Sequence, residues 1–200
     1  EEAMHLGLPM DIEAILLIEA DGSNLQAVTH EIETSAEICR NSGARMVTVA
    51  KDEVERAKLW KGRRSVSPAL ARKAPNKLGE DITVPRSAIP EAVKRLKQVS
   101  AKYGLPIVIF GHAGDGNLHP HILFDKRDPE QWAKVEKMVA EEFAIALELG
   151  GTLSGEHGVG TLKRPYLERA LGSVSVSIQK QIKHVFDPFN ILNPGKVLPD

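Results

Sequence analysis

The sequence predicts an α+β fold in which an antiparallel or mixed sheet carries helices packed on one face. β-prone runs alternate with helical patterns along the 200 residues. Two of these runs, 105–110 and 118–124, are separated only by a glycine-rich stretch, which indicates a hairpin. With 42% hydrophobic and 26% charged residues, the composition is that of a globular protein. This length predicts one compact unit or two closely merged subdomains.

The first third of the chain predicts two strands and two helices. Residues 12–18 are apolar and rich in β-branched side chains, and residues 46–50 repeat this character, so we expect a strand in each, the first of them buried. Between them, apolar residues from Leu25 to Cys39 recur at helical spacing, and the sequence 41–43 supplies a stop signal. A second, more basic helix is expected from Asp52 towards Ala71.

The remainder predicts a strand at 81–84, then a helix that begins at Pro90 and ends at Gly104, before the hairpin. A further helix is expected at 129–149, followed by a glycine-rich loop at 150–160. Two shorter helices, 163–170 and 174–185, precede a tail at 187–200. This order is compatible with two halves of similar design, although the residues themselves show no repeat.

Composition also excludes several classes of protein. A net charge of -1 gives no general electrostatic reason to bind nucleic acid, and the apolar run 14–18 is too short to span a membrane. The single cysteine, Cys39, excludes an internal disulfide and is expected to be a packed thiol in a soluble protein. P-loop, dinucleotide-binding and serine-nucleophile motifs are absent. The chain starts at Glu1 rather than Met, which we interpret as a cut at a domain boundary.

Histidines cluster in the predicted hairpin. His119 and His121 are two residues apart on a strand and should emerge on one face, and hairpin closure brings His112 opposite His119. Glu156 and His157 lie in the second glycine-rich loop. Imidazole suits zinc, iron, manganese or nickel, and a carboxylate such as that of Glu156 can complete the set of ligands. The alternative is that these residues form turns and local hydrogen bonds, a role that Asp115 and Asn117 suit best.

A second candidate group follows Trp60. Arg63 and Arg64 precede Ser67, and an arginine can hold a carboxylate through two parallel hydrogen bonds. Either arginine is therefore a candidate anchor for an organic acid. The alternative is a solvated helical face shared with neighbouring lysines.

Three motifs occur in a family-specific order: GHAGDGNLHP at 111–120, SGEHGVG at 154–160 and DPFNILNPGK at 187–196. On these motifs the whole of residues 1–200 resembles the C-terminal domain of FAD-linked oxidases of the vanillyl-alcohol oxidase superfamily. It is most similar to the branch of the glycolate oxidase D subunit and D-lactate dehydrogenase. The resemblance implies duplicated ferredoxin-like α+β units, and an N-terminal FAD-binding domain that this chain lacks.

The resemblance also implies roles for single residues. His112, His119 and Glu156 match ligands of a divalent metal (Zn, Fe or Mn), and His157 matches a substrate-side histidine that we assign as the catalytic base. Substrate contacts are expected from Arg63, Ser67 and His121, and contacts towards the cofactor FAD from Asn193 and Lys196. The alternative for the tail is a purely structural terminus.

The activity implied is flavin-dependent oxidation of a small D-2-hydroxy acid, of the glycolate or D-lactate type, to a 2-oxo acid. The isolated chain is expected to be inactive without its own N-terminal FAD domain. Further expected partners are an iron–sulfur or other electron-accepting subunit, but no nucleic acid. The expected location is cytoplasmic, with attachment to the inner face of the membrane through partners. Two alternatives stay open: a non-catalytic metal-binding or assembly module, and a metal-dependent hydrolase.

Overall fold

The computed structural model describes residue 5 and residues 7–199. The chain divides between Arg72 and Lys73 into two compact units, of which the second contains the sheet. The α+β class with helices on one face of an antiparallel sheet is therefore confirmed for the second unit.

The first unit contains the two predicted helices, α1 (Leu25–Asn41) and α2 (Glu53–Leu70). The Asn24 side chain accepts hydrogen bonds from the N–H groups of the first turn of α1, and Asp52 accepts one from Glu55 at the start of α2. Both caps satisfy N–H groups that have no partner within their helix. The predicted starts of these helices are confirmed.

The two strands predicted in the first unit are wrong. Residues 12–18 and 46–50 carry no strand, and most of their apolar side chains are exposed, with Leu16 at 66% and Met46 at 63%. The physical reason is that β-branched composition favours a strand only where a neighbouring strand and a covering core are available. Within the first unit the described elements are the two helices, which offer no edge for pairing.

The second unit is built on an antiparallel sheet with β4 (Asn117–Phe124) at its centre. On one side β4 pairs with β3 (Ile107–His112), which confirms the predicted hairpin. On the other side it pairs with β1 (Asn76–Gly79) and β2 (Ile82–Thr83) in one continuous register, although β1 lay outside the predicted strands. The two strands are separated at Glu80, opposite Pro120, because a proline has no N–H to donate to that neighbour.

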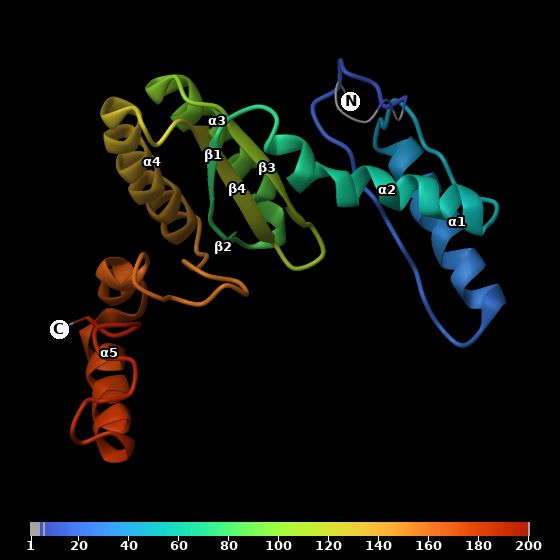
Figure 1. Cartoon of the computed structure of the whole chain (residues 1–200). Coiled ribbons are helices and arrows are strands. Elements are labelled where there is room, and N and C mark those ends of the chain that lie inside the picture. Colours follow the sequence, from blue (N-terminus) through green and yellow to red (C-terminus); the bar gives the residue numbers. More distant parts are fainter. Residues whose placement is uncertain (1–4, 6, 200) are drawn as a thin grey trace. The chain divides into compact units, whose positions relative to one another are not determined.

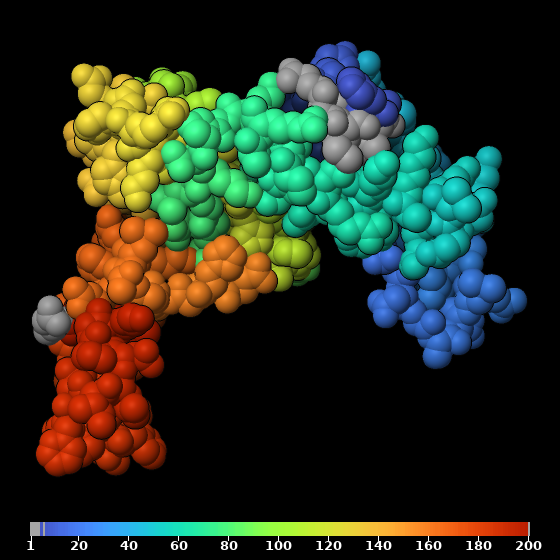
Figure 2. Space-filling view, viewed as in Figure 1, coloured from blue at the N-terminus to red at the C-terminus, as the bar shows by residue number. Residues whose placement is uncertain are grey.

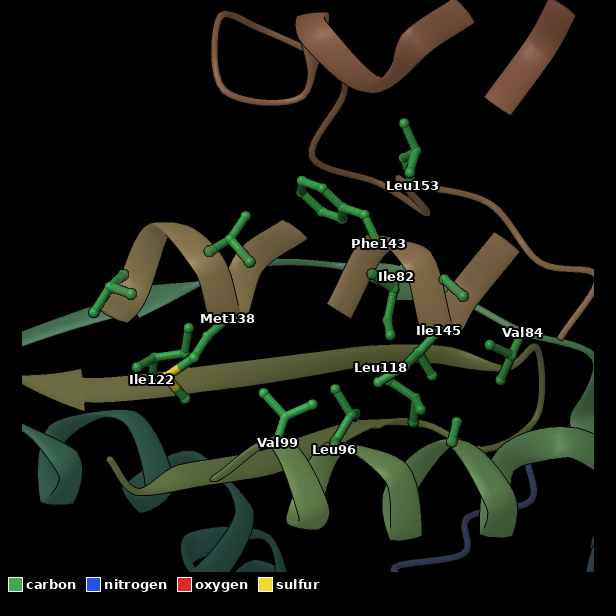
Figure 3. Packing of buried hydrophobic residues seen from close by; sticks show 14 of the residues in the cluster. Ile82, Val84, Leu96, Val99, Leu118, Ile122, Met138, Phe143, Ile145 and Leu153 are labelled. Atoms are coloured by element: carbon green, nitrogen blue, oxygen red, sulfur yellow. The ribbon is translucent and has the colours of Figure 1, made fainter. Parts of the chain in front are cut away.

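Two helices cover one face of this sheet, α3 (Ile89–Tyr103) and α4 (Pro129–Glu148) (Figure 1). Leu96 of α3 and Phe143 of α4 are fully buried in the same hydrophobic cluster as Ile82 and Ile122 of the sheet (Figure 3). The predicted helices at 90–104 and 129–149 are confirmed. Because side chains alternate along a strand, the opposite face of β4 carries Asn117, His119 and His121.

A 3-10 turn, η1 (Arg86–Ala88), precedes α3, and the C-terminal part consists of a second 3-10 turn, η2 (Arg164–Tyr166), and the helix α5 (Leu167–Phe186). The backbone of Gly172 is non-helical inside α5 and divides it, as the two predicted short helices imply. Asp187 then accepts hydrogen bonds from the N–H groups of Ile191 and Leu192, which fixes the first turn of the tail. Among the described residues, no helix is long and apolar enough to cross a membrane.

Candidate metal and substrate site

The face of the sheet opposite the helices carries the predicted histidines. His112 ends β3 and pairs in register with Asn117, while His119 and His121 lie two and four residues further along β4. The rings of His112 and His119 meet edge to face with centroids 5.6 Å apart. The hairpin thus brings the two histidines together, although they are diagonal neighbours rather than opposite each other as predicted, because the register pairs His119 with Phe110.

The tight turn of this hairpin depends on Gly116. Its φ is +86°, and a Cβ there would overlap the carbonyl oxygen of Val84. Asp115 Oδ1 accepts the N–H of Asn117 at 2.9 Å, so the turn-forming role predicted for Asp115 is confirmed. The hairpin end is therefore held close to Val84, which follows β2.

The second glycine-rich loop is held against β2. Thr83 and Thr152 exchange backbone hydrogen bonds of 3.1 and 2.8 Å, after which the chain turns back over the histidine face. Here Asp81 Oδ2 accepts the N–H groups of Gly155, Glu156 and His157 at 2.8, 2.6 and 2.8 Å. In the space-filling view this loop, drawn in orange, lies at the surface (Figure 2).

Three ligand-type side chains converge at this point. Donor atoms of His112, His119 and Glu156 all lie within 4.8 Å of one another, and Glu156 Oε1 is 3.1 Å from Nε2 of His119. His119 is buried, whereas His112 and Glu156 are exposed. Two imidazoles and one carboxylate form a donor set suited to a divalent transition metal, with an open side towards solvent.

Charge and burial at the site favour this donor set. Burial lowers the pKa of His119, which favours the neutral imidazole that binds metals; the nearby Glu156 carboxylate only partly opposes this shift. Burial alone would raise the pKa of Asp81. The ammonium of Lys163 and the backbone N–H groups of His157 and Glu156 outweigh burial, and the pKa of Asp81 falls to about 2. Asp81 is therefore a fixed negative charge beneath the loop.

His157 lies beside the donor set. Its ring stacks on that of His119 with centroids 5.3 Å apart, and its Nε2 atom is 3.9 Å from Glu156 Oε1. Its Nδ1 atom is 3.6 Å from Asp81 Oδ1. The side chain is 47% exposed, so a ligand at the donor set has access to it.

His121 lies on the same face, one pleat further along β4. Its Nδ1 atom is 3.2 Å from the carbonyl oxygen of His119, and its ring packs on Phe110 with centroids 4.6 Å apart. On β1, Gly79 lies directly against this ring, since a Cβ there would be 2.5 Å from Nε2. The ring orientation is thus set by the absence of a side chain at 79.

The remaining predicted residues lie elsewhere in the chain. Arg63 and Ser67 are on α2, in the first unit. Asn193 and Lys196 are exposed in the tail, where the Lys196 N–H lies 3.3 Å from the carbonyl oxygen of Asn193. The next residue, Val197, donates to the carbonyl oxygen of Gly160 at 2.9 Å, which ties the tail to the end of the glycine-rich loop.

Sequence reasoning missed Asp81 and Lys163. Lys163 is buried, and its Nζ atom contacts Asp81 Oδ1 and donates to the Asp81 carbonyl oxygen at 3.0 Å. The one sequence signal for a role of Asp81 is that a charged residue stands at the start of a predicted strand. Nothing local in the sequence marks Lys163 as its partner.

Comparisons with known proteins identify the family of this chain. The model of the family "FAD linked oxidases, C-terminal domain" matches residues 1–197. The glycolate oxidase subunit GlcD of Bacillus subtilis (strain 168) is 46% identical over 197 residues, covering 98% of this chain and 42% of that protein. A D-lactate dehydrogenase of Anaerostipes hadrus is 35% identical over 188 residues, covering 94% of this chain and 40% of that protein.

Among solved structures, a 4-ethylphenol oxidase from Gulosibacter chungangensis in complex with isoeugenol aligns with a TM-score of 0.55. It is 16% identical, and the match covers 86% of this chain and 38% of that one, so this likeness concerns the fold alone. The chain spans about two fifths of the length of the curated relatives named above. The family predicted from the three motifs is confirmed: the chain belongs to the FAD-linked oxidases, as their C-terminal domain.

Proposed function

We propose that this chain is the substrate- and metal-binding domain of a flavin-dependent dehydrogenase that oxidises a D-2-hydroxy acid, of the glycolate or D-lactate type, to a 2-oxo acid. The observation that carries the proposal is the convergence of His112, His119 and Glu156 donor atoms within 4.8 Å. The family supports a flavin enzyme, and the names of the relatives support a hydroxy acid as substrate class.

The donor set fits Zn, Fe or Mn. Each of these ions accepts imidazole nitrogen and carboxylate oxygen, and the exposed side of the site leaves room for a substrate. A divalent ion bound there would lower the pKa of a substrate hydroxyl group. FAD, held mainly by an N-terminal domain, would accept the hydride from the α-carbon.

The chain's own residues bind the substrate and move the proton. Arg63 receives the substrate carboxylate through paired hydrogen bonds, and Ser67 and His121 contact the rest of the molecule. His157 takes the hydroxyl proton as the α-hydrogen leaves. Its half-exposed ring, stacked on His119 beside the donor set, supports this assignment.

The tail is proposed to fold back towards the FAD domain, with Asn193 and Lys196 near the cofactor. Large apolar side chains beside them are exposed, including Phe189 at 84% and Ile191 at 73%. Such a concentration of exposed apolar surface is typical of a covered interface. An electron-accepting subunit is a further proposed partner, since relatives are named as oxidase subunits. The duplicated ferredoxin-like arrangement also stays a proposal.

The test is turnover of a panel of D-2-hydroxy acids by the protein expressed from its full reading frame. We expect oxidation of at least one acid of the panel, loss of activity with a chelator, and recovery when Zn²⁺ or Mn²⁺ is added back. If the protein oxidises none of these acids under any condition, the proposed enzymatic function is contradicted and a metal-binding or assembly module is favoured. Cleavage of an ester or phosphate panel by the metal-loaded chain would favour a hydrolase instead.

A further inference from the structure

Asp81 has an unusual set of contacts for a residue that is itself neither a predicted substrate contact nor a predicted metal ligand. It is fully buried, and one of its oxygens, Oδ2, accepts three consecutive backbone N–H groups, those of residues 155–157. Ser154 Oγ lies 3.2 and 3.3 Å from its two oxygens. One carboxylate therefore fixes the whole segment 154–157.

The position of Asp81 in the sheet relates this segment to the histidines. β1 and β2 share one register along β4, which places Asp81 opposite His119. The backbone of Glu156 is consequently fixed relative to the strand that carries His119. This relation determines where the Glu156 carboxylate meets the imidazole at 3.1 Å.

Side-chain packing alone would not hold these groups. The side chains of Glu156 and His157 are 54% and 47% exposed, so few neighbours restrict their rotamers. Carboxylates that accept backbone N–H groups form strong, charge-assisted hydrogen bonds. The three backbone hydrogen bonds to Asp81 therefore restrain this part of the loop directly.

Lys163 supplies the compensating charge. A buried carboxylate is costly unless it is paired and hydrogen-bonded. The Lys163 ammonium is itself buried, contacts Asp81 Oδ1, donates to the Asp81 carbonyl oxygen and lies 3.5 Å from Glu80. The N–H groups of the loop and the ammonium together form an anion site that the protein's own carboxylate fills.

We propose that Asp81 is a positioning residue that holds Glu156 and His157 in place for metal binding and proton transfer, with Lys163 as its counter-charge. The inference rests on the proposed metal site. Replacement by Asn preserves shape but removes the charge, and its NH₂ group cannot accept hydrogen bonds. The segment 154–157 would then lose acceptors, and the Glu156 carboxylate would lose its fixed approach to His119.

The experiment measures Mn²⁺ binding, by electron paramagnetic resonance of the free ion, in the protein expressed from its full reading frame. Partners that orient metal ligands typically change affinity 10–100-fold, and we expect Asp81→Asn to weaken Mn²⁺ binding about tenfold or more. The matched control is Asp125→Asn, whose carboxylate also accepts a backbone N–H and pairs with an arginine, Arg127, but at the far end of β4. It should bind Mn²⁺ like the wild type.

Turnover measured at saturating Mn²⁺ distinguishes the displacement of His157 from the loss of bound metal. We expect saturating Mn²⁺ to restore only part of kcat in Asp81→Asn, because His157 is displaced as well. If Asp81→Asn does not fold, Ser154→Ala replaces it, with Mn²⁺ affinity reduced about tenfold, the effect of one hydrogen bond to a charged group. Wild-type affinity in the folded Asp81→Asn protein, or in Ser154→Ala where that replaces it, would overturn the inference.

Parallel variants of the ligands distinguish the two proposals. If His112→Ala and Glu156→Gln lose Mn²⁺ binding while Asp81→Asn retains it, the metal site stands and the positioning role of Asp81 fails. If His112→Ala and Glu156→Gln bind Mn²⁺ like the wild type, the metal site itself fails.

Discussion

Nε2 of His119 and Oε1 of Glu156 lie 3.1 Å apart, although one belongs to the central strand β4 and the other to a glycine-rich loop after α4. The contact joins a buried imidazole to an exposed carboxylate, with His112 close to both. It depends on two features outside the donor set: the Asp81 anchor and the close approach of Gly155 to the sheet.

Gly155→Ala should open the site. A Cβ at this position would lie 2.6 Å from both Asn117 Cγ and Thr83 Oγ1, and both of these side chains are on paired strands. The loop must move away from the sheet, at a cost of about 1–3 kcal/mol in the free energy of unfolding. The control is Gly114→Ala, where nothing lies within 4 Å. Denaturant unfolding of both variants measures this cost. Equal free energies of unfolding for Gly155→Ala and Gly114→Ala would contradict the prediction.

Gly79→Ala should act through His121. The added methyl group would lie 2.5–2.8 Å from the ring, so the imidazole must rotate from its place on Phe110. We expect KM for the hydroxy acid to rise about tenfold, equivalent to ~1.4 kcal/mol of binding, with Mn²⁺ affinity unchanged. The same substitution made on top of His121→Ala should raise KM no further. A further rise in that background would show that Gly79 acts by another route.

His157→Ala should slow turnover without removing the metal. Loss of a general base typically costs 10²–10⁴-fold, so we expect kcat to fall at least about 100-fold at saturating substrate. Mn²⁺ affinity should stay within about twofold of wild type because the three ligands remain. His184→Ala, at an exposed position on α5, serves as the control. Near-full turnover in His157→Ala would exclude the base role and leave the metal role intact.

Glu142→Gln should stabilise the protein, increasingly so at higher pH. Glu142 is fully buried on α4, and neither carboxylate oxygen has a hydrogen-bond partner among the described residues. Burial, and secondarily the Glu80 carboxylate, raise the pKa of Glu142 well above its usual value. The folded state therefore binds this proton more tightly than the unfolded state, and wild-type stability falls as pH rises above the ordinary glutamate value.

Glutamine cannot ionise, so the variant should escape this loss and exceed the wild-type free energy of unfolding by about 1–3 kcal/mol at pH 8, with a smaller difference at pH 5. Thermal and denaturant unfolding across this range provide the measurement. Glu136→Gln, at an exposed position of the same helix, is the matched control. If the gain in the free energy of unfolding of Glu142→Gln does not grow with pH, the raised pKa of Glu142 is contradicted.

The parts of the site that the sequence predicts are those that depend on local pattern. The two-residue spacing of His119 and His121 determines their shared face, and the short hairpin connection determines that His112 meets His119. Both hold in the structure because neither depends on distant segments. Glu156 was a candidate ligand from its residue type and its glycine-rich loop, and the family resemblance then matched it to the metal site.

The parts that sequence could not supply depend on non-local pairing. Asp81 meets its loop, and Lys163 meets Asp81, only after the sheet has formed and the chain has returned from α4. The strands expected at 12–18 and 46–50 fail for the same reason, since apolar β-branched runs become strands only where a partner strand exists. Local composition carries no information about that partner.

X-ray absorption of the Zn²⁺-loaded protein, expressed from its full reading frame, tests the metal centre most directly. We predict a first shell that contains imidazole nitrogens from His112 and His119 at about 2.0–2.1 Å together with carboxylate oxygen. In Glu156→Gln the bound fraction should fall, and in His112→Ala the imidazole scattering should decrease. A shell without imidazole, or one that contains sulfur, would contradict the assignment of His112, His119 and Glu156 as the ligands.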